Sequence, residues 1–336
     1  MATKGRLRVP WGFVGFFYLS YLLKLQSRGL AFSREPGEQL FDYDEDLAKL
    51  TVVYSSASYS ENPFVANWTF TNQECNYLTE GFVVNETYLA DGTEAFGFIG
   101  VDTSAGWIVG SFKGTSTFHD WITDLRTWLH YNDACAPAEG GEELTGRVHF
   151  GFCNYYSSLV ALGMADRLAL LARENPTYSV LLTGHSLGGA SAAICAADLT
   201  QRLGLPGDRV VLYTIGEPRV GDGVFAEGLN AAVGTVYRLV HNRDVVPHLP
   251  PCCHTWRGRC KSEEVCPYHH ADEVVYANDM GEGADFVVCN GTDGENYDCD
   301  PPSIDLSISD HQFYFELQVS VYCAEDNEAA AVPYQV

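Results

Sequence analysis

The chain has 336 residues, enough for one large domain core or two modest ones. Its formal net charge of −24, from 44 acidic and 20 basic side chains, repels phosphate backbones and anionic membrane surfaces. The charge therefore excludes nucleic acid as a partner and favours a neutral or zwitterionic substrate.

The first residues form a candidate secretion signal. A basic segment precedes an apolar run, 11–23, which is too short to cross a bilayer comfortably but has the length of a signal-peptide core. Small residues at 29–31 provide a cleavage site, so a signal peptide is predicted over 1–31 and a single mature domain over 32–336. Basic residues between the apolar run and the cleavage site leave an uncleaved signal anchor as the alternative.

The remaining sequence alternates between helix-like and strand-like patterns. Helices are expected over 40–59, 155–173 and 224–232, and strands over 96–101, 107–112, 209–215, 235–241, 273–277 and 285–290. The alternation between residues 147 and 241 predicts an α/β fold, with a mainly parallel central sheet and helices on both faces. The stretch 252–270 is an irregular cysteine-rich insertion.

Residues 178–203 are the most informative stretch of the chain. The apolar run at 180–182 has no polar interruption, as in a strand that is buried on both faces. It is followed by Gly184-His-Ser186-Leu-Gly188 and then by apolar residues at helical spacing. The two glycines allow a sharp turn from strand to helix, which exposes the serine hydroxyl at the positive end of the helix. This pattern predicts a nucleophilic Ser186; the alternative is a glycine-rich turn with an incidental serine.

A nucleophilic serine needs a base, and the base needs an acid that orients it. In a strand–elbow–helix architecture, the acid and then the histidine follow the serine along the chain. Asp244 comes just after the strand expected at 235–241, at the sheet edge where site residues gather, although it could instead be a turn aspartate. His311, which precedes an aromatic run, is the preferred base. His269 and His270 also follow Asp244, but they fall in the cysteine-rich insertion.

Eleven cysteines accompany the candidate export signal. Cys195 lies within the helix expected after the elbow and is predicted to be a buried free thiol, which leaves ten cysteines for five disulfides. Cys289 and Cys299 are expected to close the loop between them. The insertion holds a further cluster: Cys252, Cys253, His254, Cys260, Cys266, His269 and His270. Its spacings fit no standard zinc finger and an exported chain oxidises such thiols, so two disulfides are favoured over zinc.

Three Asn-x-Thr sequons, at Asn67, Asn85 and Asn290, are candidate glycosylation sites and agree with export. The acidic residues between 293 and 300 match no complete calcium loop. No metal and no cofactor are therefore expected.

Several motifs resemble, in the same order, those of the fungal-type class 3 triacylglycerol lipases of Rhizomucor and Thermomyces. They are Phe112-Lys-Gly-Thr-Ser116, Gly184-His-Ser-Leu-Gly-Gly189, Gly216-Glu-Pro-Arg-Val-Gly-Asp222, Arg243-Asp-Val-Val-Pro-His-Leu-Pro250, and the closing Asp310-His311 with Tyr314-Phe315. The resemblance runs from about residue 45 to 323 and leaves out the N-terminus and the insertion. It implies an α/β-hydrolase fold with Ser186, Asp244 and His311 as the catalytic triad.

The same resemblance places the oxyanion-hole donors at Thr115 and at the backbone N–H of Leu187, with a helix N-cap as the alternative role of Thr115. It places a lid on the segment that follows, where an amphipathic helix with aromatic residues is expected. The lid residues are Phe118, Trp121, Ile122 and Leu125. An ordinary helix packed on the core is the alternative to a lid. Cys135–Cys153 is a further candidate disulfide, and so is Cys75–Cys323, because the reference lipases tie their terminal regions together similarly.

Together these features predict a secreted carboxylester hydrolase that cleaves lipid esters, with triacylglycerol favoured, through an acyl-enzyme. It is expected to be a monomer that contacts neutral lipid surfaces transiently. A feruloyl esterase, a phospholipase A1 and a diacylglycerol lipase are alternatives on the same framework. Two hypotheses of other kinds are a non-catalytic lipid- or carbohydrate-binding relative, which a lost triad residue would favour, and a membrane-tethered intracellular lipase.

Overall fold

The computed structural model describes residues 41–115, 135–138, 141–252, 255–256, 259–260, 266–289, 294–295 and 305–324. All of them belong to one compact unit, Pro36–Val336. Within these ranges no helix is both long enough and apolar enough to cross a membrane. The signal peptide expected over 1–31 lies outside the described residues and stays a prediction.

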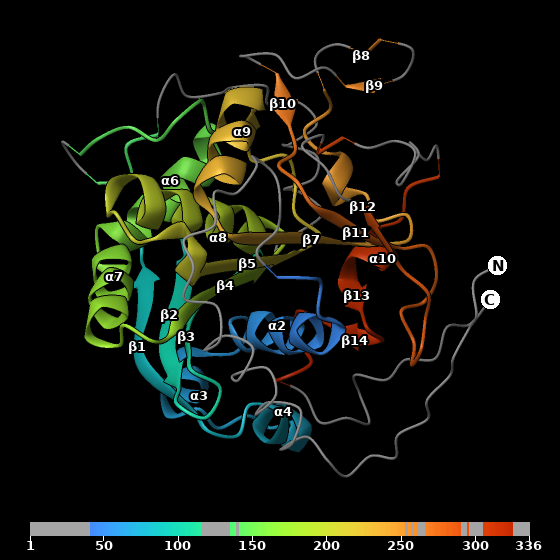
Figure 1. Ribbon diagram of the computed structural model, residues 1–336. Helices are drawn as coiled ribbons and strands as arrows, with labels where there is room; N and C mark the ends of the chain where they lie inside the picture. Colours follow the sequence, from blue (N-terminus) through green and yellow to red (C-terminus); the bar gives the residue numbers. More distant parts are fainter. Residues whose placement is uncertain are drawn as a thin grey trace. The chain divides into compact units, whose positions relative to one another are not determined.

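An eight-stranded sheet forms the centre of the described structure, in the order β1-β2-β3-β4-β5-β7-β11-β12 (Figure 1). Its strands are β1 Phe82–Ala90, β2 Ala95–Asp102, β3 Trp107–Phe112, β4 Ser179–His185, β5 Val210–Ile215, β7 Thr235–His241, β11 Glu273–Tyr276 and β12 Val287–Cys289. Strands β3, β4, β5, β7 and β11 are parallel. Strand β2 runs antiparallel to β1 and β3, and β12 runs antiparallel to β11. The mainly parallel sheet predicted from the sequence is confirmed.

Helices cover both faces of this sheet (Figure 1). The helices α6 Phe150–Val160, α7 Met164–Glu174, α8 Leu187–Ala197 and α9 Gly223–Ala232 lie on one face, and α2 Glu45–Ala57 lies on the other. Successive residues of β4 point to opposite faces, because side chains alternate along a strand. Val180 and Leu182 therefore join the main core with α6 to α9, whereas the Thr183 hydroxyl lies 3.1 Å from that of Ser55 in α2.

Short elements connect these layers. They are α3 Asn62–Asn67, α4 Gln73–Leu78, the π-helix Asp198–Arg202, the 3₁₀-helices Gly207–Arg209 and Val246–His248, β6 Gly221–Asp222, β8 Thr255–Trp256, β9 Arg259–Cys260, β10 Pro267–Tyr268, α10 Ile308–Gln312, β13 Phe313–Tyr314 and β14 Leu317–Gln318. The last three follow β12 in the chain and bring its C-terminal part back to the sheet.

Two expected helices differ from the observed ones. Helix α2 begins at Glu45 rather than near residue 40, because Asp44 caps it by accepting a hydrogen bond from the Leu47 N–H at 3.0 Å. The single helix expected over 155–173 is wrong: the structure has α6 and α7, separated at Gly163, whose φ of 94° cannot continue a helix. Strand β1 was not predicted from the sequence. It is an edge strand with an irregular register near Asn85, so its apolar residues do not alternate regularly.

Disulfides join distant parts of the described structure. Cys75–Cys323 links α4 to the C-terminal segment, Cys135–Cys153 links α6 to the segment before it, and Cys252–Cys260 lies in the insertion. Cys266 and Cys289 are also disulfide-bonded, whereas Cys253 and Cys299 lie outside the described residues. Cys195 is a buried free thiol, and burial raises its pKa. No group of three or more metal-binding side chains is found in the described ranges.

Thiol titration of the denatured, unreduced protein is expected to detect about one free thiol per chain, that of Cys195. The physical reason is that an oxidising compartment pairs the remaining ten cysteines. A Cys195→Ala variant is the control and should titrate close to zero. Five or more thiols in the unaltered chain would contradict the expected disulfide framework.

Candidate active site

Ser186 stands at the junction of β4 and α8. Its backbone has φ 61° and ψ −125°, a strained conformation that persists only where the surrounding structure holds it. A Cβ atom on Gly184 would lie 2.2 Å from the Gly188 backbone, and one on Gly188 would lie 2.1 Å from the Phe112 carbonyl oxygen. The turn therefore requires glycine on both sides of the serine, as its sequence pattern indicates.

The hydroxyl of Ser186 is buried and has no hydrogen-bond partner among the described residues. The backbone of the same residue is fixed, because its N–H donates to the Ile215 carbonyl at the end of β5, at 2.9 Å. Leaving a buried hydroxyl unbonded costs free energy, and such groups are found where function requires them. The elbow thus holds its backbone rigidly while the hydroxyl remains available.

Asp244 and His311 form a buried pair. Asp244 follows β7, and His311 lies in α10. The His311 Nδ1 atom is 2.9 Å from Asp244 Oδ1 and 2.8 Å from Oδ2. A carboxylate can only accept, so Nδ1 carries the proton and Nε2 carries the lone pair that a general base needs.

Three donors keep the Asp244 carboxylate charged. Burial raises its pKa, but attraction to His311 and hydrogen bonds from His311, Tyr314 and the Val246 N–H bring the pKa below its usual value. Tyr314 Oη donates to Oδ2 at 2.6 Å, and the Val246 N–H donates to Oδ1 at 2.8 Å. The carboxylate can therefore stabilise a positive charge that forms on the histidine.

Gly216 brings the serine and the acid–base pair together. It follows Ile215, which accepts the Ser186 N–H, and its φ of 55° is one that side chains disfavour. A Cβ atom at Gly216 would lie 2.7 Å from Asp244 Oδ2 and 2.8 Å from His311 Nδ1. The pair therefore packs directly against the strand end that supports the serine.

His185 connects the elbow to the backbone of the base. Its Nε2 atom is 2.8 Å from the His311 carbonyl oxygen, and its Nδ1 atom is 2.9 Å from Tyr59 Oη. Burial and the neighbouring His311 lower the pKa of His185 to about 3, so its ring is neutral. Because a carbonyl only accepts, Nε2 carries the proton and Tyr59 donates to Nδ1. The residue before the serine thus fixes the position of His311.

Both residues expected to form the oxyanion hole follow elements that meet at the elbow. Leu187 is the first residue of α8, so its N–H belongs to the positive end of that helix. The end of β3 is aligned with the elbow, since Phe112 pairs with Gly184. A Cβ atom at Gly114 would lie 2.6 Å from the His185 carbonyl oxygen, and Thr115 follows it directly. The helix N-cap considered for Thr115 would involve residues outside the described ranges.

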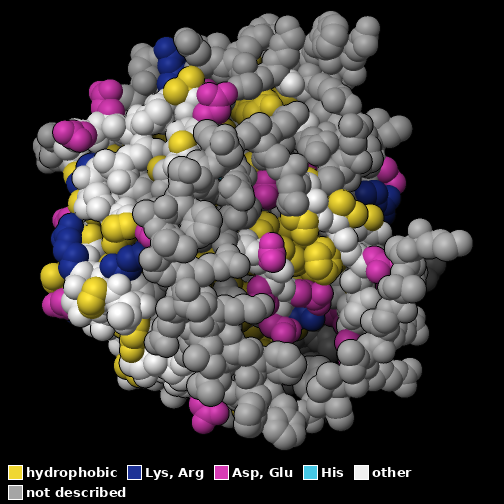
Figure 2. All heavy atoms as spheres, viewed as in Figure 1, with side chains coloured by type: hydrophobic (Ala, Val, Ile, Leu, Met, Phe, Trp, Pro, Cys, Tyr) yellow, Lys and Arg dark blue, Asp and Glu magenta, His cyan; other side chains and the backbone are white. Residues whose placement is uncertain are grey.

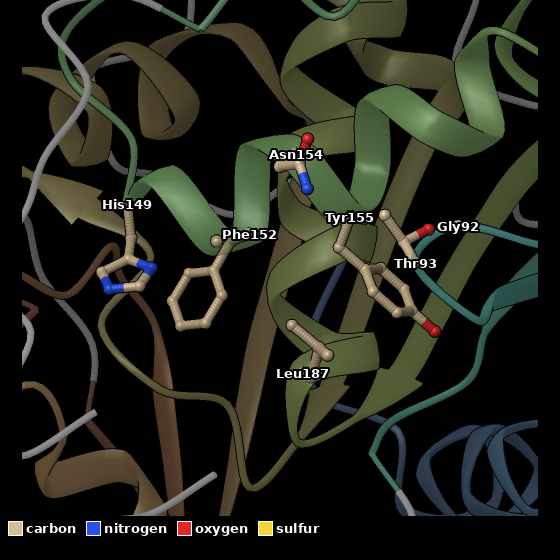
Figure 3. Close-up of a pocket in the computed structure, with 8 residues that line it drawn as sticks. Gly92, Thr93, His149, Phe152, Asn154, Tyr155 and Leu187 are labelled. Carbon is tan, nitrogen blue, oxygen red and sulfur yellow. The ribbon is translucent and has the colours of Figure 1, made fainter. Parts of the chain in front are cut away.

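A cavity of about 350 Å³ lies beside the elbow (Figure 3). It is lined by Gly92, Thr93, His149, Gly151, Phe152, Asn154, Tyr155 and Leu187. In Figure 3 the rings of His149, Phe152 and Tyr155 lie on the side of α6 where Leu187 is, whereas Asn154 points to the opposite side. The cavity can accept the apolar part of a ligand whose polar end lies near the start of α8.

Comparison with known proteins finds a family with a similar sequence around this site. The family model described as Lipase (class 3) matches residues 109–254, which include the elbow and Asp244. A lipase of Rhizomucor miehei is 35% identical over 213 residues, or 62% of this chain and 52% of the relative. A Caenorhabditis elegans lipase is 29% identical over 322 residues, or 90% of this chain and 86% of the relative. The solved Rhizomucor miehei triacylglyceride lipase aligns with a TM-score of 0.67 and 28% identity, over 82% of this chain and 96% of that chain.

Over residues 109–254 the chain is similar to the class 3 lipase family. Its α/β-hydrolase fold, which the resemblance implied, is confirmed. The aligned segment spans about half the length of the Rhizomucor sequence, 52%, and most of the nematode sequence, 86%.

Some of the expected site residues lie outside the described ranges. They are the lid residues Phe118, Trp121, Ile122 and Leu125, and the sequon residue Asn290. The other two sequon residues, Asn67 and Asn85, are exposed on α3 and β1. The described bonds of the two insertion histidines do not go to the Asp244 carboxylate: His269 Nε2 donates to the Pro247 carbonyl at 2.6 Å, and His270 Nε2 lies 2.8 Å from Glu217.

The sequence alone did not reveal the residues that hold the candidate site together. Tyr59 lies 126 residues before its partner His185, and Tyr314 lies 70 residues after Asp244. No local pattern joins positions so far apart. His185 stands within the serine motif and Tyr314 within the aromatic run after His311, so both were visible but had no assigned contact.

Proposed function

We propose that this protein is a serine carboxylester hydrolase that cleaves lipid esters, with triacylglycerol as the favoured substrate. The observation that carries the proposal is the buried Asp244–His311 pair packed against Gly216, beside the elbow of Ser186. A solved triacylglycerol lipase, 28% identical with a TM-score of 0.68, is described as having a serine protease triad as its catalytic centre. That description supports the same three roles in this chain.

In the first half of the reaction, Ser186 Oγ attacks the ester carbonyl carbon while His311 Nε2 takes the hydroxyl proton. The tetrahedral oxyanion accepts hydrogen bonds from the Leu187 N–H and from Thr115, and losing one such donor costs roughly 3 kcal/mol. His311 passes its proton to the leaving alcohol, and the acyl group remains on Ser186.

In the second half, His311 removes a proton from a water molecule, which attacks the acyl-enzyme and releases the carboxylic acid. Asp244 stays ionised throughout. Burial raises its pKa, but His311, Tyr314 and the Val246 N–H lower the pKa by more. Its charge stabilises the imidazolium that forms in each half-reaction.

The surroundings of the elbow favour an apolar, uncharged ester. Phe152, Tyr155 and Leu187 contribute apolar surface to the cavity, where an acyl chain can lie with its carbonyl towards Ser186. Acidic side chains are scattered over the described surface in Figure 2, in keeping with the net charge of −24. Such a surface disfavours anionic lipids and leaves neutral glycerides as the better substrates.

The experiment that tests the function is a panel of emulsified triolein, dissolved tributyrin, diolein, phosphatidylcholine and methyl ferulate. We expect hydrolysis of triolein and tributyrin at higher kcat/KM than that of the others. A Fusarium solani relative, 32% identical over 219 residues, is named a secreted mono- and diacylglycerol lipase, so a preference for diolein is the nearest alternative outcome. Activity on methyl ferulate alone would instead indicate a feruloyl esterase, and no hydrolysis at all would favour a non-catalytic relative.

We further propose that the protein is secreted as a monomer after cleavage of residues 1–31. The disulfides of the described structure and the name of the Fusarium relative support export. N-terminal sequencing of the mature protein is expected to start near residue 32. A retained Met1 would indicate a signal anchor and contradict release.

Replacing Trp121 with serine is expected to weaken activity on emulsified triolein much more than on dissolved tributyrin. A lid must bury its apolar face in water and expose it to oil, and each large side chain contributes about 2 kcal/mol to that transfer. The dissolved ester does not need the oil contact. Tyr77→Ser is the control, because Tyr77 is an exposed aromatic residue on α4, 71% accessible. Equal losses on both substrates would show that Trp121 is a core residue.

A further inference from the structure

The segment that carries the catalytic acid, 244–250, is anchored at its far end by Arg219. The backbone N–H of Arg219 donates to the Leu249 carbonyl at 2.7 Å. Its guanidinium group donates from Nη1 to the Pro250 carbonyl at 3.0 Å. Arg219 lies in the connection after β5, so it ties one loop at the carboxyl end of the sheet to the next.

Arg219 is itself held by a buried carboxylate. Its Nε is 2.6 Å from Glu295 Oε1, and its Nη2 is 2.8 Å from Oε2, so the pair is bidentate. Glu295 Oε1 also accepts the His269 N–H at 3.2 Å, and the His269 ring donates to the Pro247 carbonyl at 2.6 Å. The Pro250 carbonyl at the end of the acid segment and the Pro247 carbonyl in its middle are therefore bound by side chains that this pair orients.

The anchored segment is short and stiff. Residues Val246–His248 form a 3₁₀-helix, and the Leu249 N–H bonds to the Val246 carbonyl at 2.9 Å. The Val246 N–H is one of the donors to the Asp244 carboxylate, at 2.8 Å. A movement of Leu249 and its neighbours therefore reaches the carboxylate through a single 3₁₀ turn.

We propose that Arg219, oriented by Glu295, is a positioning residue that keeps the Asp244 carboxylate aligned with His311 Nδ1. The inference rests on the esterase function proposed above. Arg219 acts through the acid segment, because it donates to the Leu249 and Pro250 carbonyls of that segment as well as to Glu295 and Cys260. Its guanidinium group donates to the Pro250 carbonyl, six residues after Asp244, so the ion pair fixes the far end of the segment that begins at the acid.

The test compares Arg219→Met, Arg219→Lys and Glu295→Gln in the full-length protein. The substrate is soluble p-nitrophenyl butyrate, and rates are expressed per active site titrated with a p-nitrophenyl alkylphosphonate. Arg219→Met is expected to lower kcat per titrated site about 10- to 100-fold with KM within about 2-fold, as for loss of a transition-state contribution. A smaller fall in kcat per titrated site is expected for Arg219→Lys, which keeps one donor, and for Glu295→Gln.

The matched control is Arg209→Met. Arg209 also donates to backbone carbonyls, those of Tyr178, Ala172 and Asn175. It directly precedes β5, however, and so lies at the amino end of that strand, away from the carboxyl end where Ser186 and Asp244 are. Its loss should lower the melting temperature while leaving kcat per titrated site unchanged. An equal loss of kcat per site in both methionine variants would assign Arg219 a general structural role and overturn the proposal.

A double-mutant cycle distinguishes action through the acid from any other effect. If Arg219 acts through Asp244, adding Arg219→Met to Asp244→Asn should reduce kcat less than about 3-fold further. If Arg219→Met lowered kcat in the Asp244→Asn background as much as it does in the unaltered protein, the proposal would be overturned. If Arg219→Met does not fold, the same cycle is measured with Arg219→Lys and Glu295→Gln. An unaltered protein that hydrolyses no ester would refute the proposed function, whereas an active protein with unimpaired variants would refute only the role of Arg219.

Discussion

Replacing Ser186 with alanine is expected to lower kcat on tributyrin by about 10⁴- to 10⁶-fold without unfolding the protein. The hydroxyl makes no hydrogen bond within the described residues, so its removal takes no interaction from the folded state. It is needed only when its oxygen attacks the ester. The measurement is kcat together with the melting temperature, which should stay close to that of the unaltered protein.

Ser191→Ala is the matched control for this variant. Ser191 is a buried serine of the same helix, and its hydroxyl donates to the Leu187 carbonyl one turn earlier, at 3.1 Å. Its removal should leave kcat nearly unchanged. If Ser186→Ala retained more than about a tenth of the original turnover, the assignment of the nucleophile would be wrong.

Replacing Asp244 with asparagine is expected to lower kcat by about 10⁴-fold with little change in KM. The carboxylate accepts from His311 Nδ1 and from Tyr314, at 2.8 and 2.6 Å, and an amide has one oxygen to serve both donors. The amide also carries no charge to stabilise the imidazolium. The histidine would then adopt the tautomer that cannot accept the serine proton.

Asp102→Asn provides the comparison for the acid. Asp102 is also a buried carboxylate, and it accepts hydrogen bonds from Ser104 and from the Ala105 N–H in the turn after β2. Its loss should lower the melting temperature and leave kcat per titrated site unchanged. A loss of kcat in Asp244→Asn no larger than in Asp102→Asn would remove Asp244 from the mechanism.

Local chemistry explains what the sequence could predict. The parallel strands are buried on both faces, so β5 and β7 appear as apolar runs with only occasional polar residues, and both were located within one residue. The elbow is equally local: Gly184, Ser186 and Gly188 lie within five residues, and the steric need for both glycines arises within the turn itself. The order of serine, acid and histidine follows from the order of the strands that carry them.

The sequence determined the elbow, the main strands and the three residues proposed as the triad, because each depends on its immediate neighbours or on motif order. Only the tertiary structure decided how they are held. Tyr59 reaches His185 across 126 residues, and Arg219 reaches Glu295 across 76. The apolar residues of the sequence continue at helical spacing through Gly163, although the backbone turns at that residue. The tertiary structure therefore also decided the break between α6 and α7. Long-range hydrogen bonds depend on which strands become neighbours, and that choice is made by burying the whole core rather than by any one segment.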